Sequence, residues 1–221
     1  MSRRGGPILP RGCGHISWRP MKTAIIIPTH KRGAMFRRLL HDLEHAPLPA
    51  DIEIHVVENG PRTEVASICG ASSLAERLRY TYLTKGSKSA ALNHAIKATG
   101  ADLLIFFDDD IVVPATIVET YIAAAKRYGE GYFFGGPLIA DIEIPCPADL
   151  APYLPLSAKG WYPSTHEIVM PRDEFAYFFG ANWAVFRSDL AKAGLFSEEL
   201  GITASRYSPM GEENEIQERL L

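Results

Sequence analysis

Cysteine is scarce in this chain, whose 221 residues include only Cys13, Cys69 and Cys146. An odd set of three, spread along the chain, excludes a disulfide framework and a cysteine-based zinc cluster. Reduced thiols in a cytoplasmic protein are therefore expected. Long hydrophobic runs are also lacking, because no stretch of about 18 apolar residues that could span a membrane occurs. The opening segment, residues 1–20, has no apolar stretch of the kind that a secretory signal needs.

Positive charge is not in excess either. Lysine and arginine number 23 against 26 aspartates and glutamates, which gives a formal net charge of −3. Nucleic-acid binding requires a clustered basic surface, so nucleic acid is excluded as the first choice of partner. Five of the basic residues lie within residues 1–22, where no acidic residue occurs. The rest of the chain is therefore acidic, which favours metal-ion chemistry over phosphate binding by charge alone.

Glycine-rich phosphate motifs are missing after the first predicted strand. A dinucleotide-binding fold places G-x-G-x-x-G there and a P-loop places G-x-x-x-x-G-K-[ST], but residues 29–33 match neither. This absence disfavours NAD, flavin and Walker-type ATP binding. Residues 85–89, Lys-Gly-Ser-Lys-Ser, precede a predicted helix and could hold a diphosphate with backbone N–H groups and a lysine. A solvated loop explains the same sequence, and the spacing leaves both interpretations open.

Short apolar runs alternate with helical patterns after Met21. Residues 1–20 are interrupted so often by glycine and proline that they are predicted to be a flexible arm or an incorrectly assigned start. Strands are predicted over 24–27, 52–57, 80–83, 103–107, 133–140 and, with a break at Gly180, 175–187; helices are predicted over 34–45, 89–98, 114–128 and 212–221. This order predicts an α/β fold, with one domain over 21–221 and a mostly parallel, Rossmann-like central sheet covered by helices on both faces.

Three consecutive aspartates, Asp108, Asp109 and Asp110, follow the apolar run 103–107. Open parallel sheets bind ligands beyond the carboxyl ends of their strands, which is where these side chains would lie. Side chains alternate along an extended chain, so Asp108 and Asp110 are expected to face the same way. Two converging carboxylates favour a hard cation such as Mg²⁺ or Mn²⁺. An acidic turn that caps the following helix is the alternative.

Two adjacent acids, Glu212 and Glu213, open the last predicted helix. The helix dipole favours carboxylates in a first turn, and this effect alone could explain them. On a helical wheel centred between Ile216 and Leu220, Glu213 lies about 40° from the centre and Glu212 about 60°. Glu213 is therefore predicted to point inward, as a candidate general base, and Glu212 to turn further from the cleft.

Six segments, in this order, resemble the family 2 glycosyltransferases of the GT-A fold, above all bacterial enzymes of polysaccharide assembly. They are residues 25–32 (IIIPTHKR), 56–60 (VVENG), 89–93 (SAALN), 106–110 (FFDDD), 180–187 (GANWAVFR) and 211–215 (GEENE). The resemblance implies inverting transfer of a sugar from a UDP-, GDP- or dTDP-sugar to a hydroxyl of a glycan or lipid-linked acceptor. It also implies Mn²⁺ or Mg²⁺ as the cofactor.

The same resemblance implies roles for single residues. The nucleotide would be bound by Pro28, Thr29, His30, Arg32, Glu58, Lys88, Asn93, Asp108 and Asp109. Asp110 would hold the metal, and Gly180, Ala181, Asn182 and Trp183 would border the sugar and the acceptor. Glu213 would be the catalytic base, with Glu212 as its rival.

Departures from the family pattern keep other interpretations open. Glu58 and Glu213 stand where aspartate is usual, and relatives normally continue beyond the final helix, so truncation and a degenerate domain that only binds nucleotide or glycan are alternatives. Residues 106–112 also fit an apolar strand followed by D-x-D-x-V, the pattern of aspartate-nucleophile phosphatases, with Asp108 as nucleophile.

The proline-rich stretch 141–172 is predicted to be a lid. The expected location is the cytoplasm, and peripheral contact with the inner face of the membrane is left open.

Overall fold

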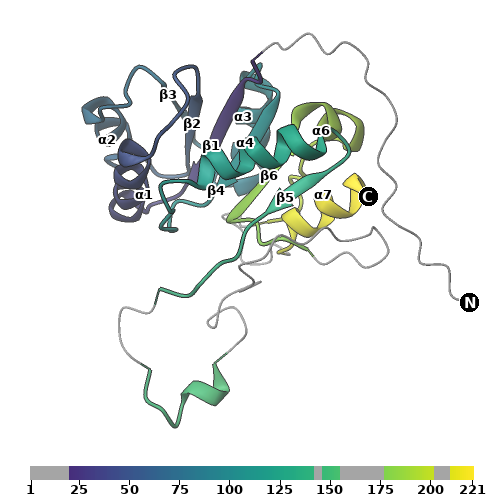
Figure 1. Ribbon diagram of the computed structural model, residues 1–221. Helices are drawn as coiled ribbons and strands as arrows, with labels where there is room; N and C mark the ends of the chain where they lie inside the picture. Colours follow the sequence, from purple (N-terminus) through teal and green to yellow (C-terminus); the bar gives the residue numbers. More distant parts are fainter. Residues whose placement is uncertain (1–19, 142–145, 155–176, 202–209) are drawn as a thin grey trace, which may run out of the picture.

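The computed structural model describes residues 20–141, 146–154, 177–201 and 210–221, and it contains a six-stranded sheet between two layers of helices (Figure 1). The strands are β1 (Thr23–Thr29), β2 (Glu53–Asn59), β3 (Leu78–Leu83), β4 (Leu103–Phe107), β5 (Phe133–Gly135) and β6 (Asn182–Phe186). The helices are α1 (Gly33–His45), α2 (Val65–Ala71), α3 (Lys88–Ala98), α4 (Ile117–Tyr128), α6 (Arg187–Ala193) and α7 (Glu212–Leu220), with a 3-10 turn, η1, at Ala151–Tyr153.

The sheet has the strand order β3-β2-β1-β4-β6-β5. Strands β1 to β4 are parallel to one another, and β6 and β5 are each antiparallel to their neighbours. The prediction of a mostly parallel sheet is therefore confirmed. All residues of β1 and β4 are buried, as expected for apolar runs without alternation in a strand that is covered on both faces.

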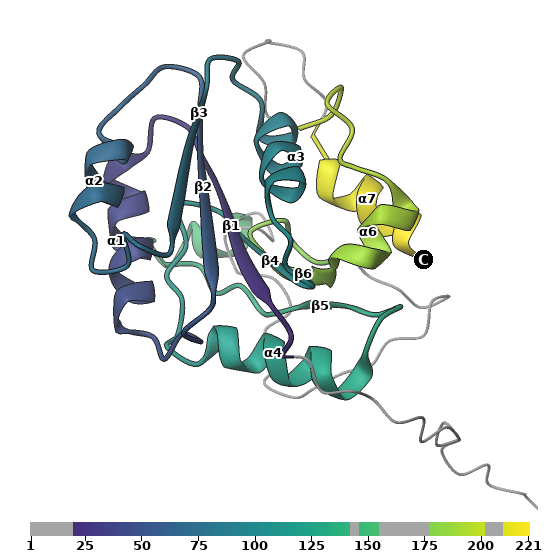
Figure 2. The same cartoon turned by 90° about the horizontal axis from the view of Figure 1, so that it is seen from above.

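Two hydrophobic cores lie on opposite faces of the sheet. Figure 2 shows the helices that cover these two faces. Helices α1, α2 and α4 pack on the face that receives Ile25 and Ile27 of β1. Helices α3, α6 and α7 pack on the other face, which receives Ala24 and Ile26. The alternation of side chains along one strand thus feeds both layers, and the predicted helices on both faces are confirmed.

The direction of winding reverses at the centre of the sheet. Helices α1 and α2 connect β1, β2 and β3 over one face, whereas α3 crosses the other face to bring the chain to β4, beside β1. Such a reversal between neighbouring parallel strands leaves a crevice outside their carboxyl ends, where open α/β sheets bind ligands. The site is therefore sought at the ends of β1 and β4.

Several predicted boundaries were wrong in the second half of the chain. The strand predicted over 133–140 ends at Gly135, because Gly136 and Pro137 follow and proline cannot donate to a strand ladder. The strand predicted over 175–187 begins only at Asn182, after a turn at Gly180, and Arg187 already opens α6. Helices α2 and α6, of seven residues each, were not predicted because such short segments show little periodicity.

Parts of two other predictions lie outside the described residues. They are the arm, over residues 1–19, and most of the predicted lid, over 142–145 and 155–172. None of the helices in the described part of the chain has the length and hydrophobicity that a bilayer crossing requires.

Candidate active site

The carboxyl ends of β1, β2 and β4 and the start of α3 enclose an open pocket of about 120 Å³. It is lined by Pro28, Thr29, His30, Arg32, Asn59, Gly86, Lys88, Asp108 and Asp109. Seven of these nine residues were predicted to bind the nucleotide, so the structure brings most of that set together. Gly86 belongs to the segment 85–89, for which the sequence left a diphosphate contact open, and Asn59 was given no role in the site.

Asn59 ties three parts of the pocket wall to one another. Its side-chain Nδ2 donates to the carbonyl of Thr29 (3.0 Å) and its Oδ1 accepts from the backbone N–H of Ser87 (3.0 Å). Its own carbonyl lies 2.5 Å from Nδ1 of His30. The sequence signal at this position was the Asn-Gly pair, which indicates a turn and gives no sign of these bonds.

Gly60 makes room for the His30 ring. Its φ of +88° lies in the left-handed region, and a Cβ at this position would stand 2.4 Å from Cε1 of His30. A side chain here would therefore be strained and would displace the ring from the pocket wall. The absence of a side chain at Gly60 therefore allows the His30 ring to lie against the pocket wall.

Lys88 carries the positive charge at the floor of the pocket. Its Nζ lies 2.8 Å from Oδ1 of Asp108 and 3.5 Å from Oε1 of Glu212. Burial opposes the charged form, but the two carboxylates outweigh burial and raise the pKa of Lys88. The lysine is therefore held as a cation in the segment for which the sequence left a diphosphate contact and a solvated loop both open.

The other two aspartates, which follow β4, contact the turn between β1 and α1. Asp109 is buried and accepts from the backbone N–H of His30 (3.4 Å), and Arg32 forms ion pairs with both Asp109 (3.4 Å) and Asp110. Burial raises the pKa of Asp109, and Arg32 counteracts it. Lys31, between the two pocket residues of this turn, has φ +58°, a backbone conformation that non-glycine residues seldom adopt. The local strain coincides with the site.

Two residues predicted to bind the nucleotide do not line this pocket. Glu58 is completely buried, and its carboxylate accepts from the N–H and hydroxyl of Thr63 (both 2.6 Å) and from the hydroxyl of Tyr80 (2.5 Å). Asn93 bonds the backbone of Phe196 through both its Oδ1 and its Nδ2, at 2.9 Å each. Both side chains hold neighbouring loops, because partners from distant segments occupy their polar groups.

The burial of Glu58 leads to a stability prediction. Tyr80→Phe removes one of its donors and leaves a buried carboxylate less well satisfied, which should lower the free energy of unfolding by about 1–3 kcal/mol. Urea denaturation measures this change. Tyr82→Phe is the matched control, because the Tyr82 ring packs under Arg62 and remains there in the variant. Equal stability of the two variants would contradict the role given to Tyr80.

The first turn of α7 does not follow the helical wheel. Glu212 is only 4% exposed, whereas Glu213 is partly exposed, so the prediction that Glu212 turns further outward was wrong. The wheel describes the sides of a helix, but Glu212 is buried at its beginning by Lys88 and Gly201. Glu213 packs against Gly180, where a Cβ would lie 3.1 Å from its Cδ. Burial and the Glu212 carboxylate raise the pKa of Glu213.

A short bridge joins α7 to the end of β4. The buried amide of Gln217 accepts from the N–H of Phe178 (2.8 Å) and donates to its carbonyl (3.0 Å). Three residues later, the carbonyl of Ala181 accepts from the N–H of Asp108 (3.2 Å). The segment 178–181 therefore holds Glu213 near the pocket, a function of Gln217 for which the sequence offered no signal.

The residues predicted to border the sugar and the acceptor fall into two groups. Gly180 and Ala181 lie at the site, next to Glu213 and Asp108 respectively. Asn182 is buried and accepts from the Tyr121 hydroxyl (2.7 Å). Trp183 is 1% exposed and stacks on Phe106, with ring centroids 4.7 Å apart, so it belongs to the core. A direct contact of Trp183 with a sugar is not supported.

The donor set around the pocket fits a metal ion that is shared with a substrate. No group of three or more His, Cys, Asp or Glu side chains able to hold a metal occurs within the described residues. The partly exposed carboxylate of Asp110 is not part of the pocket lining, but it pairs with Arg32, which is. Mg²⁺ is commonly bound by one or two carboxylates together with substrate phosphates and water.

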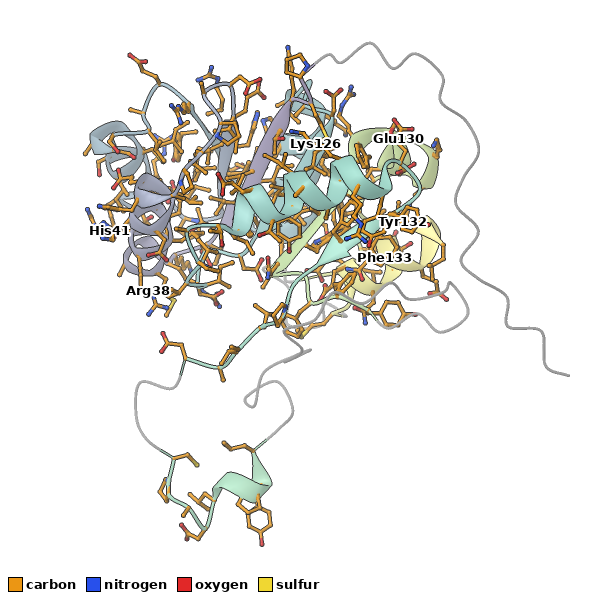
Figure 3. The ribbon with its side chains drawn as sticks, in the orientation of Figure 1. Arg38, His41, Lys126, Glu130, Tyr132 and Phe133 are labelled. Carbon is orange, nitrogen blue, oxygen red and sulfur yellow. The ribbon has the colours of Figure 1, made fainter. Side chains whose placement is uncertain are left out.

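A second cavity, of about 240 Å³, lies between β5, α6 and α7. Tyr132 and Phe133, labelled in Figure 3, line it together with residues of the two helices. Its charged side chains already bind one another or the backbone: Lys192 pairs with Asp189 (2.9 Å), and Arg219 donates to Leu195 (2.7 Å). The smaller pocket remains the better candidate, because it lies at the reversal of winding and holds the clustered charges.

The comparisons with known proteins bear on the family and on the fold. The model of the family described as Glycosyl transferase family 2 matches residues 24–191. A search of the curated proteins finds no match. Among solved structures, the mannosyltransferase PcManGT from Pyrobaculum calidifontis, in complex with GDP-Man and Mn²⁺, is 19% identical, with a TM-score of 0.55 over 84% of this chain and 50% of that chain.

TarS 1-349 from S. aureus is 16% identical, with a TM-score of 0.63 over 90% of this chain and 55% of that chain. Its complex with UDP-GlcNAc is 17% identical, with a TM-score of 0.58 over 81% and 50% of the two chains. The chain thus spans about half the length of these solved structures. At such low identity the likeness shows the fold, and it confirms the predicted GT-A class.

Proposed function

The chain belongs to glycosyl transferase family 2, and from that premise we propose that it transfers a sugar from a nucleoside-diphosphate sugar to an acceptor hydroxyl, with inversion. The observation that carries the proposal is the pocket at the ends of β1, β2 and β4, with Lys88 at its floor and Glu213 on the neighbouring helix start. Residues 21–221 would form one catalytic domain. Two of the similar structures contain GDP-Man or UDP-GlcNAc, which supports a donor of this class.

The pocket offers separate contacts for the parts of such a donor. The base would lie beside Pro28, Thr29 and His30, where the buried Thr29 hydroxyl, near Asp109, makes no well-formed hydrogen bond within the described residues. Lys88 would meet the diphosphate, and Asp108, already oriented by Lys88, would accept from the ribose hydroxyls.

Asp110 would hold Mn²⁺ or Mg²⁺ against the diphosphate, as the second acid of a D-x-D motif. When bound, the metal supplies positive charge that offsets the charge on the departing nucleoside diphosphate. Arg32, which pairs with Asp110, supplies a further positive charge at the same edge of the pocket. The protein would thus neutralise the leaving group from both sides, with Lys88 on the floor and Arg32 at the edge.

Glu213 would remove the proton from the acceptor hydroxyl. The hydroxyl oxygen then forms a bond to the anomeric carbon while the bond to the diphosphate oxygen breaks, and the electron pair of that bond leaves with the nucleoside diphosphate. Attack from the side opposite the leaving group inverts the anomeric centre. The raised pKa makes Glu213 a stronger base than an exposed glutamate. Holding both substrates in one geometry supplies much of the remaining acceleration.

The nature of the acceptor follows from the resemblance alone. A glycan or lipid-linked precursor of polysaccharide biosynthesis is proposed, in a cytoplasmic reaction that a lipid-linked acceptor would bring to the inner face of the membrane. The phosphatase alternative loses its basis, because the chain belongs to a transferase family and Asp108 follows the fourth strand along the chain. A degenerate, binding-only domain remains the competing hypothesis.

A donor screen tests the proposal. UDP-, GDP- and dTDP-sugars are incubated with the protein and a panel of glycan and lipid-linked acceptors in the presence and absence of Mn²⁺, and the released nucleoside diphosphate is quantified. One nucleotide class should release diphosphate in a Mn²⁺-dependent reaction. Binding of a nucleoside diphosphate without turnover of any donor would establish the binding-only domain instead, and absence of both would refute the proposal.

A further inference from the structure

Glu212 occupies a closed position between three segments of the chain. Its side chain is 5% exposed, and its Oε1 lies 3.5 Å from Nζ of Lys88 at the start of α3. A Cβ on Gly201 would stand 3.0 Å from both Cδ of Glu212 and Oγ of Ser89. The hydroxyl of Ser89 in turn donates to the carbonyl of Leu200 (2.8 Å). The carboxylate of Glu212 is therefore confined on all of these sides.

Such confinement is unsuitable for a proton acceptor that must meet a second substrate. A general base needs access to the hydroxyl that it deprotonates, either directly or through one water molecule. Glu212 also shares the Lys88 cation with Asp108, so its carboxylate is already engaged in an ion pair. Glu213, one residue later, is partly exposed beside Gly180.

We infer that Glu212 is a positioning residue: its buried carboxylate anchors the Lys88 ammonium at the floor of the donor pocket and sets the charge around Glu213, which alone receives the proton. The ammonium is held between Asp108 and Glu212 and lines the pocket between them. A flexible lysine would otherwise lose rotamer entropy when it bound a diphosphate. The inference rests on the proposed function, because the diphosphate and the proton transfer come from it.

The charges around Glu213 come from its own helix and from α3, whose lysine is paired with a carboxylate at the end of β4. Glu212 precedes it on α7, and Lys88 reaches it from α3, with Asp108 paired to that lysine from the end of β4. Gly180, on the segment before β6, is uncharged. Removal of the Glu212 charge should therefore make Glu213 easier to ionise, and removal of the Lys88 charge should make it harder to ionise.

The test is a ¹³C NMR titration of the full chain labelled at the glutamate carboxyl carbons. Glu213→Gln identifies the Glu213 resonance by its disappearance. In Glu212→Gln the midpoint of that resonance should move down by about 0.5–1 pH unit, and in Lys88→Met it should move up by a similar amount. Glu218→Gln, an exposed change on the same helix, is the matched control and should move it little.

The two variants give opposite signs, so a general loosening of the fold cannot imitate the result. If Glu212→Gln does not fold, the upward shift in Lys88→Met still tests the charge cluster. An unmoved Glu213 midpoint in the folded variants would overturn the inference, as would a Glu212→Gln protein that loses sugar transfer at every pH while Glu213→Gln keeps it. If the Glu213 midpoint moves in opposite directions in the two variants but the protein turns over no donor, the proposed function is refuted. The role of Glu212 as the residue that anchors Lys88 would then still hold.

Discussion

Glu213→Gln is expected to lower the rate of sugar transfer by about 10²–10⁴-fold, the usual contribution of a positioned general base. The substitution preserves the size of the side chain that packs on Gly180, and it removes only the basic carboxylate. The affinity for a nucleoside diphosphate, measured by calorimetry, should change little, because the Lys88–Asp108 pair remains in place. A fall in kcat without loss of donor binding locates the defect in the chemical step.

Two further variants make this prediction specific. Glu213→Asp retains a carboxylate and should keep more activity than Glu213→Gln, although its shorter side chain misplaces the base. Glu218→Gln neutralises an exposed acid on the same helix and should transfer sugar at nearly the normal rate. Normal transfer by Glu213→Gln would show that another group removes the proton, and the assignment of the base would be wrong.

Asp110→Asn should abolish the metal-dependent part of donor binding. In the unchanged protein, Mn²⁺ with a nucleoside diphosphate at about 100 times its Kd should stabilise the fold by about 2.7 kcal/mol, because the ligand binds the folded state alone. The variant removes the charge of the Asp110 carboxylate, which pairs with the pocket residue Arg32. Thermal unfolding followed with and without Mn²⁺ measures the difference.

Asp51→Asn provides the control for this experiment. Asp51 is exposed in the turn before β2, so its loss should leave the Mn²⁺-dependent rise in Tm unchanged. The same rise in Asp110→Asn as in the unchanged protein would place the metal at another group and would remove the basis of the D-x-D assignment.

The central fold was predictable because its signals are local. The apolar runs at 24–27 and 103–107 lack alternation, which is typical of strands with two covered faces, and both lie within fully buried strands. The wrong boundaries lie at Gly135, where β5 ends before Gly136 and Pro137, and at Gly180, whose turn precedes the start of β6 within an otherwise apolar sequence. Apolar residues predict which segments are buried, but the backbone geometry of glycine and proline decides where the hydrogen bonds between strands end.

The candidate site was predictable in position and less so in detail. Strand ends at Thr29 and Asp108 meet because parallel neighbours must end at one edge of the sheet. The uses of Glu58 and Asn93 could not be derived, since Tyr80, Thr63 and Phe196 occupy their polar groups from other segments. Likewise, the burial of Glu212 comes from α3 and Gly201, which a helical wheel does not include.

The most direct test of the account is the position of a nucleoside diphosphate in crystals grown with Mn²⁺. We expect the diphosphate between Lys88 and Asp110, the metal on the Asp110 carboxylate, and the base beside Thr29 and His30. The contradicting result would be a nucleotide bound in the cavity between β5, α6 and α7, with the pocket at the ends of β1 and β4 left empty.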